Sequence, residues 1–157
     1  MVRHPAFYRH HRPRTRTACP RSLPTHQPEL MKLTVRNYHL DGYGHVNNAR
    51  YLEFFEEARW AFFEERGLLH ELAGLILIVA RIDIRYSRPA VEGDVLQFSC
   101  RLKTPGTRRI VLTQTITLPN GKTAAEADIT LMPVHAATQR TVSLPATLAR
   151  ALEALSE

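Results

Sequence analysis

The sequence contains few cysteines, no long apolar run and no acid in its first 28 residues. Its longest mainly apolar stretch, residues 68–80, is interrupted by His70 and Glu71 and is too short to cross a bilayer as a helix, so we expect no membrane insertion. Cys19 and Cys100 provide neither a disulfide framework nor a metal-ligand spacing. No apolar segment of signal-peptide type is present. These absences favour a cytoplasmic protein without a metal site.

The excess of positive charge is confined to one segment. Residues 1–28 hold six arginines and no Asp or Glu, so this stretch accounts for the whole formal net charge of +6. Residues 29–157 contain 15 bases and 15 acids and are neutral overall. The positive charge therefore gives no support to a nucleic-acid partner for the body of the protein.

Residues 1–30 are rich in Arg, His, Pro and Thr and poor in aliphatic side chains, which predicts a disordered N-terminal extension. It could be a basic arm for anionic surfaces, a transit peptide, a metal site formed by His4, His10 and His11, or an addition upstream of a functional start at Met31. The last interpretation is the simplest. Residues 31–157 then form a single domain, which is long enough to bury a core.

Hydrophobic periodicity predicts an α+β fold. Residues 32–38 alternate as a half-buried strand does, and a long helix is expected over residues 49–66, closed by Gly67. Its predicted core face carries Tyr51, Leu52, Phe55, Ala58 and Phe62. Further strands are expected over residues 75–86, 95–103, 109–118 and 122–134, and a last helix over residues 145–155. This order indicates an antiparallel sheet wrapped around one central helix.

The polar loop before the long helix is the candidate site, because no nucleophile elbow, phosphate loop, dinucleotide fingerprint or metal-binding helix motif is present. The first N–H groups of a helix lack intrahelical partners and can bond a carbonyl that gains negative charge. Asp41, a few residues upstream, could attack such a carbonyl or activate water, with N–H groups near Asn48 and Ala49 as oxyanion donors. On composition alone, Asp41 is more often a turn or cap residue than a catalyst, His45 could equally be a packing residue, and Asn47 and Asn48 could be no more than helix caps.

Two segments resemble a known family. The run YHLDGYGHVNNARYLEFFEEARW, residues 38–60, resembles the hotdog-fold acyl-CoA thioesterases of the 4-hydroxybenzoyl-CoA thioesterase superfamily, and is most similar to the thioesterase III type that acts on long-chain acyl-CoA. Residues 82–90, IDIRYSRPA, are similar to a second block of that family. The resemblance begins near Met31 and leaves the basic tail without a counterpart. It implies a hotdog fold and hydrolysis of medium- to long-chain acyl-CoA without a cofactor.

The resemblance also implies roles for individual residues. Asp41 falls on the family's catalytic aspartate, which acts as general base or nucleophile, and the Asn48 amide falls on the group that polarises the thioester carbonyl. His45 is expected to be a helper, because Tyr43 stands where the plant acyl-carrier-protein thioesterases with a similar HVNN stretch have an Asn. Candidates for substrate binding, including contacts with the acyl chain and the Coenzyme A phosphates, are Tyr43, Asn47, Tyr51, Phe55, Arg88 and Arg109.

The family further implies a homodimer or homotetramer, a dimer of dimers, with the acyl tunnel between subunits. Alternatives remain open for the activity: a thioesterase for acyl-carrier-protein or aryl-CoA substrates, a hotdog dehydratase, or a non-catalytic module that binds acyl-CoA. No metal, organic cofactor or nucleic-acid partner is expected.

Overall fold

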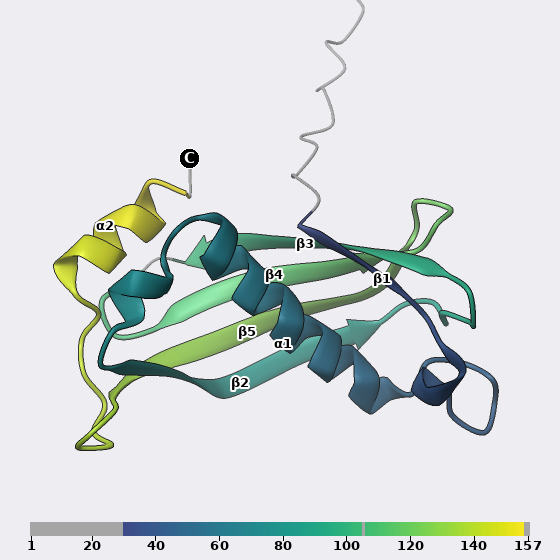
Figure 1. The fold of residues 1–157 in the computed structure, drawn as a ribbon, viewed down its shortest axis with the longest axis horizontal. Helices are drawn as coiled ribbons and strands as arrows, with labels where there is room; N and C mark the ends of the chain where they lie inside the picture. The colour runs from purple at the N-terminus through teal and green to yellow at the C-terminus, as the bar shows by residue number, and fades with distance from the viewer. Residues whose placement is uncertain (1–29, 105, 156–157) are drawn as a thin grey trace, which may run out of the picture.

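A computed structural model of the chain describes residues 30–104 and 106–155. Five strands form one antiparallel sheet, and the long helix α1 (Asn48–Glu65) lies across one of its faces (Figure 1). In the spatial order of the sheet, the strands are β1 (Met31–Thr34), β3 (Val95–Thr104), β4 (Ile110–Thr117), β5 (Thr123–His135) and β2 (Leu75–Tyr86). The predicted α+β architecture is therefore confirmed for the body of the chain, whereas the predicted extension, up to residue 29, lies outside the described residues.

Both ends of α1 follow from local sequence chemistry. The side chain of Asn47 caps the helix start, where its Oδ1 accepts a hydrogen bond from the Ala49 N–H at 2.9 Å. At the other end Gly67 adopts a φ of +64°, a left-handed conformation that is strained for any residue with a Cβ. The predicted helix boundaries are thus confirmed to within one residue.

The buried stripe of α1 packs on the sheet, but one predicted core residue lies outside it. Leu52 is 37% exposed, so its assignment to the core was wrong. It shares a stripe at four-residue spacing with Glu56 and Trp60, which are also exposed. Trp60 lines a groove with Leu77 of β2, and β2 is the last strand of the sheet, so this side of the helix lies where the sheet ends.

The first predicted strand is shorter than its alternation suggested. β1 ends at Thr34, and the short 3₁₀ helix η1 (Asn37–His39) replaces the rest. His39 causes the change, because its Nδ1 accepts the Arg36 N–H at 3.0 Å and its buried ring packs edge-on against Phe54 of α1. The later strands and α2 (Ala146–Glu153) begin and end within two residues of their predicted limits.

A buried polar contact holds α1 over the middle of the sheet. Gln114 of β4 is fully buried; it donates a hydrogen bond to the Phe55 carbonyl at 3.0 Å and accepts one from Arg59 at 3.2 Å. Arg59 also forms an ion pair with Glu56 of the same helix. Burial lowers the pKa of Arg59, and the neighbouring Glu56 carboxylate opposes that effect. Because buried polar groups need partners, this contact favours one position of the helix over the sheet.

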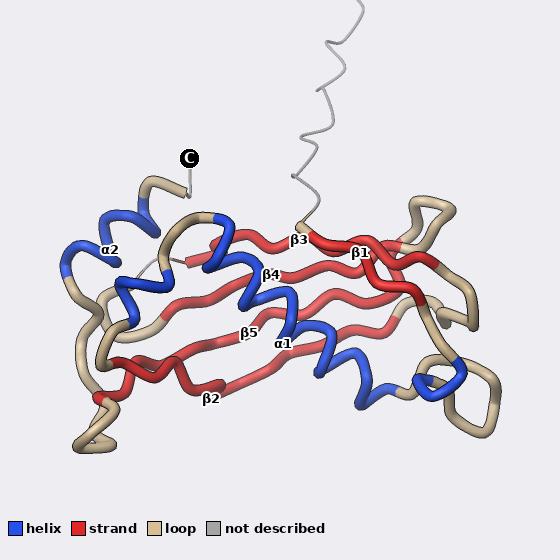
Figure 2. The backbone as a smooth tube through the Cα atoms, in the orientation of Figure 1, coloured by secondary structure: helices blue, strands red, loops and turns tan. Residues whose placement is uncertain are grey.

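The polar loop before α1 lies at one end of the sheet (Figure 2). The backbone trace shows η1, the loop that follows it and the start of α1 gathered there, while α2 and the second 3₁₀ helix, η2 (Leu69–Leu72), lie at the opposite end (Figure 2). Among the described residues, no helix has the length and apolar character needed to span a membrane.

Candidate active site

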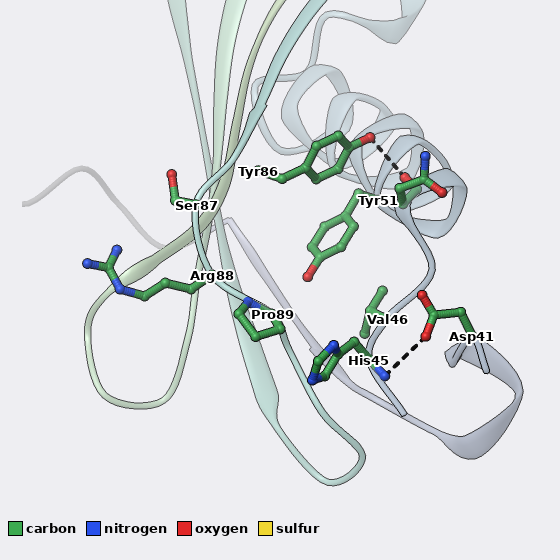
Figure 3. A pocket seen from close by; sticks show the side chains of 9 residues that line it. Asp41, His45, Val46, Tyr51, Tyr86, Ser87, Arg88 and Pro89 are labelled. Atoms are coloured by element: carbon green, nitrogen blue, oxygen red, sulfur yellow. Dashed lines mark hydrogen bonds between the residues drawn. The ribbon is translucent and has the colours of Figure 1, made fainter. Parts of the chain in front are cut away.

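A pocket of about 400 Å³ opens at the N-terminal end of α1 (Figure 3). The polar loop before the helix forms one wall, and the end of β2 with the residues after it forms the other. The lining residues are Asp41, His45, Val46, Asn48, Tyr51, Tyr86, Ser87, Arg88 and Pro89. The two sequence segments that resemble the thioesterases therefore face each other across this pocket.

Backbone hydrogen bonds hold the polar loop in a closed turn. The Asp41 N–H donates to the His45 carbonyl at 2.8 Å, and Gly44 takes a φ of +77° to make that turn possible. The Val46 N–H donates to the Ala90 carbonyl at 2.9 Å, which ties the loop to the segment after β2. The loop is thus fixed to the sheet by main-chain contacts.

The Asp41 carboxylate is held by one of its two oxygens. Oδ1 accepts a hydrogen bond from the Tyr43 N–H at 2.9 Å and one from the His45 N–H at 3.4 Å. The second of these is drawn in Figure 3. Within residues 30–104 and 106–155, no hydrogen bond to Oδ2 is found. The carboxylate is therefore oriented while one oxygen stays available to a substrate or a water molecule in the pocket.

The sequence predicted the N–H groups near Asn48 and Ala49 as oxyanion donors, and in the structure these two groups differ. The Ala49 N–H is occupied by the cap oxygen of Asn47, so it is not available as an oxyanion donor. The N–H of Asn48 has no hydrogen-bond partner among the described residues. The peptide that carries this N–H accepts a hydrogen bond from Arg50 at the Asn47 carbonyl, at 2.9 Å, which polarises the N–H further.

Two tyrosines complete the pocket, and the sequence singled out only one of them. The buried Tyr51 accepts a hydrogen bond from the Ala90 N–H at its hydroxyl, at 3.3 Å. Tyr86, the last residue of β2, packs edge-on against Tyr51 and donates its hydroxyl to the Asn48 carbonyl at 3.0 Å. Burial raises the pKa of both phenols, so both stay protonated near neutral pH. Tyr86 could have been found from its place in the second family-like segment.

The structure brings some of the predicted substrate-binding residues to the pocket and leaves others outside. Tyr43 is 88% exposed, and Phe55 is fully buried in the core, so neither lines the pocket. Arg88 lines it, but its side chain points away from Asp41 and lies 3.4 Å from the Thr123 carbonyl (Figure 3). Arg109 lines a separate hollow beside the turn between β3 and β4, which lies at the other end of the sheet.

No group of three or more His, Cys, Asp or Glu side chains that could hold a metal ion occurs in the described part of the chain. The histidines His4, His10 and His11, singled out in the sequence, lie outside it.

Comparison with known proteins identifies the class to which this fold and site belong. The model of the thioesterase-like superfamily matches residues 35–152, which is most of the chain. The chain therefore belongs to the thioesterase-like superfamily, and the sheet around α1 is its hotdog fold.

Individual relatives agree with this assignment. The chain is 41% identical over 125 residues to the long-chain acyl-CoA thioesterase FadM of Escherichia coli, with 78% of this chain and 95% of FadM covered. The crystal structure of the probable thioesterase YbaW of Escherichia coli superposes with a TM-score of 0.73 at 39% identity, covering 83% of this chain and 100% of YbaW. A Thermus thermophilus thioesterase, solved with coenzyme A and Zn, superposes with a TM-score of 0.69 at 29% identity, covering 80% and 92% of the two chains.

Proposed function

We propose that this chain hydrolyses long-chain acyl-CoA thioesters to the free acid and Coenzyme A. One observation carries the proposal: Asp41 and Asn48 line the same pocket. Asp41 has one carboxylate oxygen without a hydrogen bond, and Asn48 has a free N–H at the start of the helix, among the described residues. The substrate class is supported by the identity with FadM, which extends over nearly the whole length of that enzyme.

The geometry suits a two-stage acyl transfer. The thioester carbonyl oxygen accepts a hydrogen bond from the Asn48 N–H, so the positive end of the helix stabilises the charge that develops there. Asp41 removes a proton from a water molecule as the water oxygen attacks the carbonyl carbon. Collapse of the tetrahedral intermediate breaks the carbon–sulfur bond, and the proton held by Asp41 passes to the departing sulfur.

Asp41 could instead attack the carbonyl directly and form a mixed anhydride that water then hydrolyses. The two routes differ in the fate of the water oxygen. After a single turnover in ¹⁸O-labelled water, mass spectrometry of the peptide that contains Asp41 tests the anhydride route. A labelled side chain establishes that route, because only attack of water on the aspartyl carbon of the anhydride places ¹⁸O there. An unlabelled carboxylate is expected of a general base, and also of an anhydride that water opens at the acyl carbon.

Removing the charge of Asp41 tests the proposal. Asp41→Asn keeps the size of the side chain and one oxygen that can accept the Tyr43 and His45 amides, so the loop should stay folded. We expect kcat on palmitoyl-CoA to fall by about a hundredfold or more. Glu92→Gln is the control, since it removes an exposed carboxylate from the connection between β2 and β3 outside the pocket. An Asp41→Asn variant that is as active as the control would refute the role of Asp41.

A panel of acyl-CoA chain lengths, aryl-CoA and acyl carrier protein substrates defines the activity further. We expect the highest kcat/KM for long acyl-CoA. A preference for acyl carrier protein or aryl-CoA would replace the proposed substrate with one of those alternatives. Tight binding of acyl-CoA without release of free thiol in a thiol-trapping assay would show a binding module instead of an enzyme.

We also propose that two copies of the chain associate along β2. Among the described residues this strand pairs with β5 alone, and it ends the sheet (Figure 1). It exposes Ile76, Ile78 and Val79, and the neighbouring Trp60 of α1 is 55% exposed. A long apolar edge strand is prone to aggregate unless it is covered, and antiparallel pairing with the same strand of a second copy covers it. The cytoplasmic location expected from the sequence stays a prediction.

A further inference from the structure

Tyr86 makes a contact that connects the two walls of the pocket. Its hydroxyl crosses from the end of β2 to α1 and donates to the carbonyl of Asn48, the first residue of the helix (Figure 3). The N–H of the same residue, Asn48, has no hydrogen-bond partner among the described residues. A side chain of the sheet thus holds the residue whose backbone amide meets the substrate in the proposed reaction.

The phenol of Tyr86 is itself firmly placed. Its backbone is the last pair of the β2–β5 ladder, opposite Ala125, and the next residue continues the contact because the Ser87 N–H donates to the Ala124 carbonyl at 2.7 Å. Its ring packs edge-on against the buried ring of Tyr51, with 5.5 Å between ring centroids. A group supported both by a strand and by a packed ring can fix another group to a fraction of an ångström.

This tether is independent of the helix cap. Asn47 Oδ1 binds the Ala49 N–H, and the Asn47 carbonyl binds the Arg50 N–H, so these contacts join parts of the first turn to one another. They fix the shape of the turn without fixing its distance from the opposite wall. The Val46–Ala90 and Tyr51–Ala90 contacts join the loop and α1 to the segment after β2. The Tyr86 hydroxyl reaches the Asn48 backbone itself.

We infer that Tyr86 is a positioning residue of the thioesterase site: its hydroxyl holds the first residue of α1 so that the Asn48 N–H meets the developing oxyanion. This inference rests on the proposed function of Asp41 and Asn48. The hydroxyl makes no bond to the substrate and transfers no proton. Its loss therefore weakens stabilisation of the transition state without removing a reacting group.

Tyr86→Phe tests the inference, because it keeps the ring and its packing on Tyr51 and deletes the hydroxyl alone. Loss of one hydrogen bond that orients the oxyanion donor should lower kcat on palmitoyl-CoA by about tenfold. The dissociation constant for S-hexadecyl-CoA should change less than about twofold, because this thioether has no carbonyl to meet the amide. The shape of the pH profile of kcat should stay that of the wild-type protein.

Tyr38→Phe is the matched control, since Tyr38 is exposed on η1 and does not line the pocket. It should leave kcat and thioether binding unchanged. A Tyr86→Phe variant with the kcat of this control would overturn the inference, and so would a changed pH profile, which would mark a proton-transferring phenol. A common loss of thioether binding and kcat would also overturn it, because that result indicates a collapsed pocket.

Asp41→Asn measured beside these variants separates the inference from the proposed function. If Asp41→Asn is inactive while Tyr86→Phe matches the control, the proposed site stands and the role of Tyr86 fails. If Asp41→Asn is fully active, the proposed site itself fails.

Discussion

At the scale of single residues, the Asn48 N–H can be removed by substitution, because it lies at the first position of a helix. Asn48 is the first residue of α1, the position where proline is best tolerated in a helix, and the preceding Asn47 has a φ of −58° and a ψ of 138°, which suits a residue before proline. Asn48→Pro therefore removes the free N–H while the helix keeps its start. We predict a loss of kcat of about a hundredfold or more, measured on palmitoyl-CoA.

Asn48→Ala is the control for this substitution, because it removes the same side chain and keeps the N–H. It should retain most of the wild-type kcat. Equal activity of the two variants would show that the Asn48 amide does not bind the oxyanion, and circular dichroism of both would establish that α1 is still formed.

Cys100 offers a second prediction at this scale. The thiol lies buried in β3, and burial raises its pKa to about 12, so almost no thiolate is present near neutral pH. We predict that Cys100 in the folded protein does not react with Ellman's reagent and reacts fully after unfolding in guanidinium. Protein that begins at Met31 is used because it lacks Cys19. Rapid labelling of the folded protein would contradict the described burial.

At the scale of secondary-structure elements, a carboxylate shared by three neighbouring strands makes the stability of the fold depend on pH. Asp128 of β5 accepts a hydrogen bond from Thr113 of β4 at 2.6 Å and is paired with Lys103 of β3. The hydrogen bonds from Lys103 and Thr113 lower the pKa of Asp128. A carboxyl with a lowered pKa stabilises the fold above its unfolded pKa, and that contribution is lost as the pH falls through the folded pKa.

We predict that Asp128→Asn lowers the urea midpoint of unfolding near neutral pH, and that the difference from the wild-type protein shrinks as the pH falls below about 4. Asp83→Asn is the control, because Asp83 faces Asp128 across the β2–β5 ladder but forms only an exposed pair with Arg81, at 3.4 Å. It should change the midpoint little at any pH. A constant difference for Asp128→Asn across the pH range would contradict the assigned cause.

The β-bulge in the edge strand β2 divides its exposed surface in two. The pairing of β2 with β5 shifts register between Val79 and Arg81, so the alternation of side chains before the bulge does not continue after it. Ile76 and Ile78 are exposed before the bulge, and Arg81 and Asp83 are exposed after it. We expect the apolar part, with Ile76 and Ile78, to lie in the contact between two copies.

Charge introduced at the apolar part of the edge tests the interface. Ile78→Lys should weaken the dimer in sedimentation experiments, because the second copy would have to bury the ammonium group. A dimer that Ile78→Lys leaves unchanged would exclude the apolar part of β2 as the interface.

The elements also show what the sequence could predict. Asn47 and Gly67 marked the ends of α1 because capping depends on neighbouring residues alone. Arg59 and Gln114 could not be paired in advance, because their contact joins residues 55 positions apart and exists only once the helix lies on the sheet. The same holds for Tyr86 and Asn48, whereas Asp41 and Asn48 were recognised as one candidate site because they share a short segment.

At the scale of the whole molecule, the charge of the chain should be separable from its activity. Protein that begins at Met31 loses six arginines and Glu29 and has a formal net charge of +1, since 15 bases remain against 14 acids. Every residue that lines the pocket is retained. We predict unchanged kcat and KM for palmitoyl-CoA, measured against the full chain at low and at moderate ionic strength. If the truncated protein has a higher KM than the full chain at both ionic strengths, the tail takes part in substrate binding.

The carboxylate and the free amide lie seven positions apart on one stretch of chain, and the turn between them is closed mainly by its own main-chain contacts. The rest of the pocket comes from β2 and the residues after it. The reacting groups therefore lie together on one short segment, and substitutions in β2 can change the acyl-binding surface without altering that segment. A library that randomises the β2 wall and leaves residues 41–48 intact is a route to new substrate ranges on this scaffold.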